Sequence, residues 1–257
     1  MVRRLHKRKC KKRNRPALLN SLSRAQLLVG KESIDKLKNV HVAVFGIGGV
    51  GGYAVEALAR SGVGELTLFD NDIVSESNIN RQIIATTETV GKDKVSVMKE
   101  RVLSINPEIK VNINKVFYLP SCAHEYSFDK FDYVIDAVDT VSAKLEVVLR
   151  AKKVNVPVIS CMGTGGKTDI TALKVSDISK TKVCPLARVM RRELNKLGVN
   201  GVKVVYSEEI NIISEQDKEQ AETKSSGRIA PPSMIFVPAA AGLMLAREVV
   251  FDLIKGD

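Results

Sequence analysis

Short apolar runs alternate with longer amphipathic stretches along the chain up to residue 162. The runs that have the length of a strand occupy residues 40–46, 65–70, 110–116, 132–138 and 156–162. The first, VHVAVFG, is almost continuously apolar and ends in glycine, which is typical of a strand buried on both faces of a parallel sheet. The amphipathic stretches between the runs predict helices at 50–60, 92–105 and 142–154.

This alternation predicts the fold class. Repeated strand–helix–strand units form right-handed crossovers, so the pattern indicates an α/β, Rossmann-like fold with a mostly parallel sheet flanked by helices. Added C-terminal elements follow, namely a strand at 169–177, a helix at 184–198 and a last helix beginning near Pro238. Residues 21–39 predict a helix that is interrupted near Gly30. Without an internal repeat or a second hydrophobic pattern, residues 21–257 are expected to form a single domain.

The positive charge of the chain is concentrated at its start. The 257 residues carry a net charge of +11, and the segment 1–16 holds nine Lys or Arg and no acid, so removing those nine leaves +2 for the rest. Such a run repels itself, and residues 1–20 are expected to be a disordered basic tail. A solvated tail, a nucleic-acid contact and an address signal all fit it. The polar stretch 214–228 predicts a mobile loop.

The cysteines are scattered, at Cys10, Cys122, Cys161 and Cys184, and none forms a C-x-x-C pair. This spacing argues against a structural zinc site and against a disulfide framework. No zinc is therefore expected, and a reducing, cytoplasmic location fits best. The longest apolar stretch, at 230–246, is interrupted by prolines and predicts a buried helix rather than a membrane span.

A glycine-rich loop follows the first strand. In GIGGVG, Gly46, Gly48 and Gly51 have the G-x-G-x-x-G spacing, with Gly49 between them. Glycine lets the backbone turn tightly and approach a phosphate closely, and the N-terminus of the next helix offers free N–H donors. The loop therefore predicts a nucleotide site without saying which nucleotide binds.

The segment after the second strand, DNDIVSESNINRQ at 70–82, narrows the choice. A nicotinamide enzyme needs one acid here, Asp70, for the ribose hydroxyls. ATP chemistry needs a divalent cation and further positive charge, because charge on the transferring phosphoryl oxygens must be neutralised. Asp72 is suited to hydrated Mg²⁺, and Arg81 with Asn78 is suited to phosphate oxygens. The segment thus favours ATP over a nicotinamide.

Two more side chains fit the same interpretation. Lys94 lies near the start of a predicted helix, where it can reach a phosphate. Asp139 follows a central strand, at the edge where open α/β sheets hold their ligands, although it could simply cap the next helix.

Together these motifs resemble the ubiquitin-activating-enzyme-like adenylation superfamily, which includes the ThiF and MoeB proteins. The resemblance rests on GIGGVG, DNDIVSESNINRQ, VGKDKV and DAVDT, in this order. It implies an ATP-binding adenylation domain with Asp70 on the ribose, Asp72 and Asp139 near Mg²⁺, and Asn78, Arg81 and Lys94 on the phosphates. It also implies a homodimer in which an arginine of one subunit reaches the nucleotide of the other. SRAQLLVG resembles that segment, so Arg24 is the candidate.

Within the superfamily, the chain is similar to the tRNA threonylcarbamoyladenosine dehydratase family over most of residues 22–212. The similar stretches are RAQLLVG, NINRQI, VMKERVLSINPE, YVIDAVDTVSAK, GTGGKTD and SDISKTKVCPLARVMRREL. This resemblance implies ATP-dependent dehydration, by cyclisation, of threonylcarbamoyladenosine in tRNA through carboxylate adenylation, with Arg24, Arg81, Lys94 and Asp139 as catalytic residues. ATP and Mg²⁺ are the expected cofactors and tRNA the expected partner.

Alternatives remain open at this point. The same site can adenylate the C-terminal carboxylate of a small sulfur-carrier protein, which would bring in a sulfur-transfer or cysteine desulfurase-related partner. Cys184, before a proline at a predicted helix start, is a candidate for thiol chemistry. The strip of Arg188, Arg191, Arg192 and Lys196 is compatible with tRNA contact and equally with a solvated helix face.

Overall fold

The computed structural model of the chain describes residues 21–210 and 231–255. The predicted basic tail 1–20 and the predicted mobile loop 214–228 lie outside these residues. Within them the strands form one seven-stranded sheet in the order β3-β2-β1-β4-β5-β7-β6. The pairing is parallel from β3 to β7, and β6 pairs with β7 in the antiparallel direction. The chain thus has the Rossmann-like α/β fold that its pattern predicts.

The strands are short and follow one another in chain order with a helix or loop between them. They are β1 (His41–Phe45), β2 (Glu65–Phe69), β3 (Lys110–Asn114), β4 (Tyr133–Asp136), β5 (Val158–Cys161), β6 (Leu173–Asp177) and β7 (Lys203–Ser207). The α-helices are α1 (Ser23–Val29), α2 (Lys31–Leu37), α3 (Gly51–Ser61), α4 (Lys94–Ile105), α5 (Val141–Lys153), α6 (Pro185–Lys196) and α7 (Phe236–Lys255).

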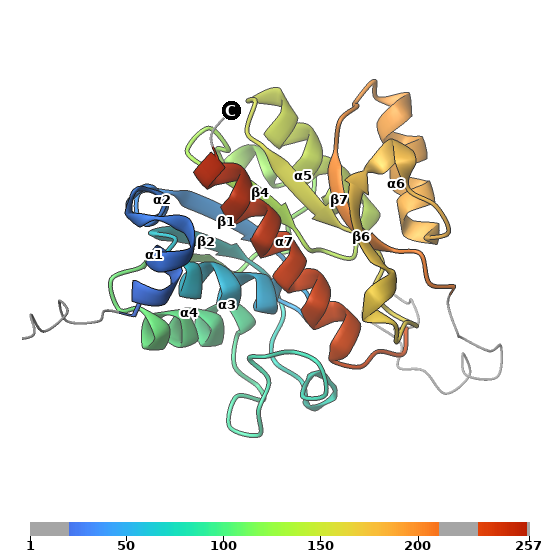
Figure 1. Cartoon of the computed structure of the whole chain (residues 1–257). Coiled ribbons are helices and arrows are strands. Elements are labelled where there is room, and N and C mark those ends of the chain that lie inside the picture. Colours follow the sequence, from blue (N-terminus) through green and yellow to red (C-terminus); the bar gives the residue numbers. More distant parts are fainter. Residues whose placement is uncertain (1–20, 211–230, 256–257) are drawn as a thin grey trace, which may run out of the picture.

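Each face of the sheet carries its own hydrophobic core, because successive side chains of a strand point to opposite faces. On β1, Val42 and Val44 pack with α2, α3, α4 and α7, whereas Ala43 and Phe45 pack with α5 and α6. Figure 1 shows α7 running across the first face beside α3, with α5 and α6 on the other side of the sheet. Burial on both faces explains why these strands are apolar throughout.

The predicted elements are confirmed with shifts of a few residues at their ends. The helix expected from residue 92 begins at Lys94, and the one expected near Pro238 begins at Phe236. Strand β7 was not predicted. Its five residues lie between β5 and β6 in the sheet and therefore separate two strands that are close neighbours in the sequence.

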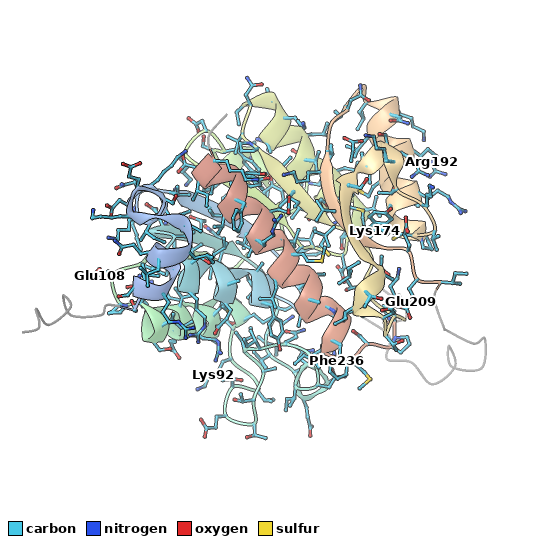
Figure 2. All side chains as sticks on the ribbon, viewed as in Figure 1. Lys92, Glu108, Lys174, Arg192, Glu209 and Phe236 are labelled. Atoms are coloured by element: carbon cyan, nitrogen blue, oxygen red, sulfur yellow. The ribbon has the colours of Figure 1, made fainter. Side chains whose placement is uncertain are left out.

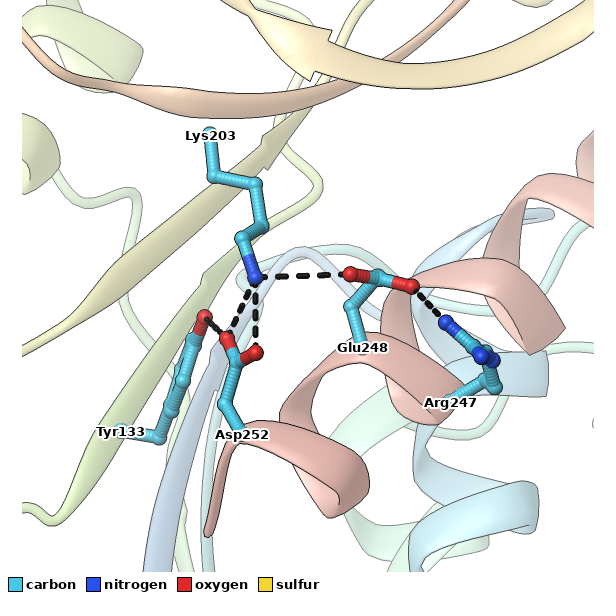
Figure 3. A network of polar contacts seen from close by, with 5 residues as sticks. All are labelled: Tyr133, Lys203, Arg247, Glu248 and Asp252. Carbon is cyan, nitrogen blue, oxygen red and sulfur yellow. Dashed lines mark hydrogen bonds and ion pairs between the residues drawn. The ribbon is translucent and has the colours of Figure 1, made fainter. Parts of the chain in front are cut away.

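The last helix is fastened to the amino-terminal edge of the sheet by a polar network (Figure 3). Lys203, the first residue of β7, lies 2.6 Å from a carboxylate oxygen of Asp252 and 3.4 Å from one of Glu248, both on α7. The hydroxyl of Tyr133, the first residue of β4, donates to the same Asp252 at 2.7 Å. This network lies at the opposite edge of the sheet from the glycine loop. No helix within residues 21–210 and 231–255 combines the length and the hydrophobicity needed to cross a membrane.

Candidate active site

The glycine loop connects β1 to α3 and makes a close contact with the loop that follows β4. Gly46 has a φ of 87°, and a Cβ there would lie 2.7 Å from the carbonyl oxygen of Ala137. A Cβ at Gly51 would lie 1.8 Å from the carbonyl oxygen of Gly46. Neither position has room for a side chain. At Gly48 the nearest atom to such a Cβ is 4.0 Å away, so this part of the loop borders open space where a phosphate can approach.

Helix α7 supports the loop from behind. A Cβ on Gly49 would lie 3.3 Å from Cβ of Pro238, and one on Gly242 would lie 2.3 Å from the carbonyl oxygen of Val50. The first turns of α7 and the start of α3 are therefore in backbone contact. This support comes from the far end of the sequence, and the spacing of the glycines gives no indication of it.

Asp70 lies just past β2 and binds the glycine loop directly. Its carboxylate accepts a hydrogen bond of 2.6 Å from the backbone N–H of Ile47 and one of 2.9 Å from the N–H of Asp72. Burial raises the pKa of Asp70 above its ordinary value of 3.8. The predicted ribose-binding acid is thus held in place by two backbone donors.

Asp72 and Lys94 form an ion pair across the start of α4. The Nζ of Lys94 lies 2.8 Å from Oδ2 of Asp72, with the lysine side chain 6% exposed and the aspartate side chain 58% exposed. The backbone N–H of Lys94 also donates to the carbonyl oxygen of Asp72 at 3.0 Å. The pair places a buried ammonium next to an accessible carboxylate at the start of α4.

Asn78 and Arg81 lie on a short turn that begins with the 3₁₀ helix η1 (Glu76–Asn78). Asn78 is buried, and its Oδ1 accepts from the backbone N–H of Ser75 at 3.2 Å. The guanidinium of Arg81 donates to the carbonyl oxygen of Ser77 at 2.7 Å and to Oδ1 of Asn80 at 3.0 Å. A Cβ on Gly49 would lie 3.6 Å from Cγ of Arg81, so this turn adjoins the glycine loop.

Asp139 occupies the loop between β4 and α5, at the point where the strand order reverses beside β1. It is exposed, and Oγ1 of Thr140 donates to its Oδ1 at 3.4 Å. The same loop carries Ala137, which contacts Gly46. Asp70, Arg81 and the Asp139 loop therefore each adjoin the glycine loop. This is the grouping that the sequence predicts at the carboxyl edge of the sheet.

Sequence reasoning missed Gln82 and Lys144 and assigned no role to Asp136. Gln82 is 6% exposed, and its Nε2 would lie 4.0 Å from a Cβ on Gly48. Its Oε1 has no hydrogen-bond partner among the described residues. The sequence feature that could have pointed to Gln82 was its position next to Arg81 in NINRQ. Asp136 and Lys144 are fully buried and paired at 2.8 Å. The sequence feature that could have pointed to Asp136 and Lys144 was a charged residue in an otherwise apolar strand and on an otherwise apolar helix face.

Arg24 lies away from this group of residues. It is exposed on α1, and the neighbouring Leu22 packs on Gly62, at the C-terminal end of α3. The glycine loop lies at the other end of α3. Beside Arg24, Leu27 and Leu28 are 87% and 82% exposed, so α1 presents an apolar surface next to this arginine.

Cys184 and the basic strip lie on α6. Cys184 is the residue before the first turn of α6 and is 3% exposed. Arg191 donates to the carbonyl oxygen of Thr181 at 2.8 Å and to its hydroxyl at 2.7 Å. Arg192 and Lys196 both bind Glu193, which offsets part of their charge. Arg192 lies on the outer side of α6 (Figure 2).

No group of three or more His, Cys, Asp or Glu residues in the described part of the chain is arranged to enclose a metal ion. Mg²⁺ at ATP sites is commonly held by one or two carboxylates together with the phosphates and water. The accessible carboxylates of Asp72 and Asp139, at the ends of β2 and β4, fit that kind of site.

The profile of the ThiF family matches residues 22–255. The chain belongs to the ThiF family. It is 44% identical over 244 residues to the tRNA threonylcarbamoyladenosine dehydratase of Bacillus subtilis, and the match covers 93% of this chain and 96% of that protein. This agreement extends beyond the glycine loop to 93% of the chain.

Solved structures of an E. coli relative have the same fold. The tRNA N6-threonylcarbamoyladenosine dehydratase TcdA in complex with ATP has a TM-score of 0.82 and 32% identity, covering 91% of this chain and 94% of that one. Its complex with AMP has a TM-score of 0.81 and 31% identity, covering 93% and 98%. A Saccharomyces cerevisiae adenylyltransferase and sulfurtransferase is 32% identical over 149 residues, which are 58% of this chain and 34% of that protein.

Proposed function

We propose that the protein is a ThiF-family adenylating enzyme that uses ATP to dehydrate threonylcarbamoyladenosine in tRNA. The observation that carries this proposal is the 44% identity to a dehydratase over 96% of that protein's length. The glycine loop, with room beside Gly48 and none at Gly46 or Gly51, supports a nucleotide at this edge of the sheet. We take residues 21–257 to be one ATP-binding adenylation domain.

Each polar group of the site has a role in this proposal. The carboxylate of Asp70 accepts hydrogen bonds from the ribose hydroxyls. The phosphates lie over the glycine loop, where Asn78, Arg81 and Lys94 donate to their oxygens. Asp72 and Asp139 hold Mg²⁺, which when bound supplies positive charge to the phosphate oxygens. The buried position of Lys94 supports its role, because a lysine held by Asp72 has little freedom to lose on binding.

The reaction proceeds in two steps and needs no nucleophile from the enzyme. A carboxylate oxygen of the threonine-derived group attacks the α-phosphorus of ATP, and the bond to pyrophosphate breaks. A nitrogen or oxygen of the same side chain then attacks the activated carbonyl carbon, loses its proton and expels AMP as a five-membered ring closes. Water is a poor leaving group and AMP a good one, so ATP cleavage drives the loss of water. The enzyme holds the two reacting groups together, which accelerates both steps.

The proposal includes a homodimer and a tRNA surface. Arg24 lies near the far end of α3 from the glycine loop of its own chain, and Leu27 and Leu28 beside it are exposed. These facts support an interface through α1 in which Arg24 reaches the nucleotide of a second copy. Arg188, Arg192 and Lys196 on α6 are exposed cations that can contact tRNA phosphates. A reducing, cytoplasmic location fits a tRNA substrate.

Adenylation of a sulfur-carrier protein is the alternative activity, and it would use a sulfur-transfer partner. The match to the yeast sulfurtransferase extends over 34% of that protein, compared with 96% of the B. subtilis dehydratase. The full-length agreement favours the dehydratase. Cys184 has no step in the proposed reaction, and its burial agrees with a place in the core.

The test is AMP release from Mg·ATP with tRNA that carries threonylcarbamoyladenosine, compared with the same tRNA lacking the modification. We expect AMP only with the modified tRNA, together with loss of the mass of one water from the nucleoside. AMP or pyrophosphate exchange that requires a sulfur-carrier protein instead would establish the alternative. No AMP with either substrate would contradict both activities.

A further inference from the structure

A buried charged cluster lies directly beneath the loop that carries Asp139. Its members are Asp136, the last residue of β4, Lys144 on α5, and Ser160 on β5, and all three are 0% exposed. The Nζ of Lys144 lies 2.8 Å from Oδ2 of Asp136, and the hydroxyl of Ser160 donates to the same oxygen. Burying such a pair removes two charges from water, which costs free energy. Two apolar side chains of similar size would therefore stabilise the core at least as much.

Within the described residues, the pair also forms hydrogen bonds with backbone groups. Lys144 donates to the carbonyl oxygen of Val138 at 3.1 Å and to that of Cys161 at 2.7 Å. Oδ1 of Asp136 accepts from the N–H of Val138 at 3.2 Å. Both polar groups of Val138, the residue before Asp139, are therefore bound by the pair. The cluster joins the ends of β4 and β5 to the loop between β4 and α5.

The same loop also touches the glycine loop. The carbonyl oxygen of Ala137 would lie 2.7 Å from a Cβ on Gly46, so the two loops are in backbone contact. Ala137 packs on the glycine loop and Val138 is bound by the buried pair, which leaves little freedom for the residue that follows. Packing alone would not fix the direction of the two peptide groups on either side of Val138. The hydrogen bonds at the N–H of one and at the carbonyl oxygen of the other do so.

We propose that the Asp136–Lys144 pair is a positioning device that holds the 137–140 loop so that Asp139 faces the bound nucleotide. The proposal rests on the proposed function, because it takes Asp139 as the residue that meets Mg·ATP. Neither Asp136 nor Lys144 touches substrate, and both act through Val138. Loss of the pair lets the loop relax, so that Asp139 no longer lies where the cation and the phosphates need it.

A double variant, Asp136→Asn with Lys144→Met, tests this role without leaving a single charge buried and unpaired. The matched control is Asp252→Asn with Lys203→Met, which removes an ion pair at the opposite edge of the sheet (Figure 3). Both double variants are checked first by circular dichroism and thermal unfolding. The readouts are kcat, KM for ATP, the Mg²⁺ concentration for half-maximal rate, and the rise in Tm that ATP causes with and without Mg²⁺.

We expect the Asp136/Lys144 variant to lose about 10- to 100-fold in kcat, to need more Mg²⁺, and to lose the additional Tm rise that Mg²⁺ gives with ATP. The control should keep all three at their wild-type values whatever its own Tm. If the two double variants behave alike in every readout, the pair is structural only and the proposal is overturned. The rise in Tm with ATP and Mg²⁺ tests the positioning role even if the wild type forms no AMP with modified tRNA. That outcome would overturn the proposed activity separately.

Discussion

The carboxylate of Asp70 lies 2.6 Å from the backbone nitrogen of Ile47, so the acid that follows β2 holds the loop that follows β1. Two strands that are neighbours in the sheet are thereby joined at their carboxyl ends. The bond restricts the conformations of the glycine loop. Less of the free energy of nucleotide binding is then lost in ordering this loop.

This contact leads to a prediction about pH. Burial raises the pKa of Asp70 above 3.8, and a protonated carboxyl accepts fewer hydrogen bonds from ribose hydroxyls. ATP affinity should therefore fall as the pH is lowered through this raised pKa, at a higher pH than an ordinary aspartate would give. Isothermal titration calorimetry with ATP across the acid range, with Tm followed in parallel, measures it. Asp70→Asn should bind ATP more weakly, and its affinity should no longer change in this window.

The free energy of unfolding should change with pH in the direction opposite to ATP affinity. The folded chain holds the Asp70 proton to a higher pH than the unfolded chain, so the free energy of unfolding falls as pH rises from the unfolded pKa through the folded one. The free energy of unfolding of Asp70→Asn, compared with that of the wild type, should therefore be higher above this pH window than below it. A wild-type affinity that is constant across the window would contradict the role of Asp70.

Much of the fold and of the candidate site could be predicted from the sequence because both depend on local signals. Strands buried on both faces must be apolar, and a loop that contacts phosphate must be glycine-rich, so β1, β2 and Gly46 are apparent in the sequence. Strand β7 and the support of the glycine loop by Gly242 depend on residues that are far apart in the chain. The Asp136–Lys144 pair was missed for the same reason, since its meaning comes from the backbone groups it binds.

The ion pair of Lys94 with Asp72 gives a prediction that separates binding from surface charge. Lys94→Met should lower kcat/KM for ATP by about 100-fold, because it removes a preorganised donor for the phosphates. Lys92→Met, two residues away and exposed (Figure 2), is the control and should leave kcat/KM close to the wild-type value. Steady-state AMP formation with modified tRNA measures both. Equal losses in the two variants would mean that net charge, and not the position of Lys94, determines the rate.

The close approach of α7 to α3 predicts an effect at a distance from the nucleotide. In Gly242→Ala, the new methyl group would lie 2.3 Å from the carbonyl oxygen of Val50, so α7 must shift. We expect the free energy of unfolding to fall by about 1–3 kcal/mol and ATP affinity to fall with it, because the shifted helix no longer supports the glycine loop. Leu243→Ala, on the exposed side of α7, is the control. Denaturant unfolding and calorimetry give the two values, and unchanged ATP affinity in Gly242→Ala would disprove the coupling.

Arg24 gives a prediction about subunit composition. If Arg24 acts on the nucleotide of a second copy, Arg24→Ala and Arg81→Ala should each be inactive alone, while a mixed dimer has one site with both arginines intact. Equal amounts of the two variants, unfolded and refolded together, should recover about a quarter of the wild-type AMP formation, since half of the dimers are mixed and each has one working site of two. Co-refolding each variant with itself is the control. Absence of recovery, with dimers confirmed by sedimentation, would rule out a shared site.

The basic residues of α6 should separate into two classes. Arg188 is exposed, so Arg188→Ala should weaken tRNA binding equally for modified and unmodified tRNA and reduce the salt slope of log Kd by about 1. Arg191 instead donates hydrogen bonds to the carbonyl and hydroxyl oxygens of the buried Thr181. Arg191→Ala should therefore chiefly lower Tm. Lys153→Ala, exposed on α5, is the control for loss of one charge. Filter binding at several salt concentrations measures the slopes. A salt slope for Arg188→Ala equal to that for Lys153→Ala would contradict the proposed contact between α6 and tRNA.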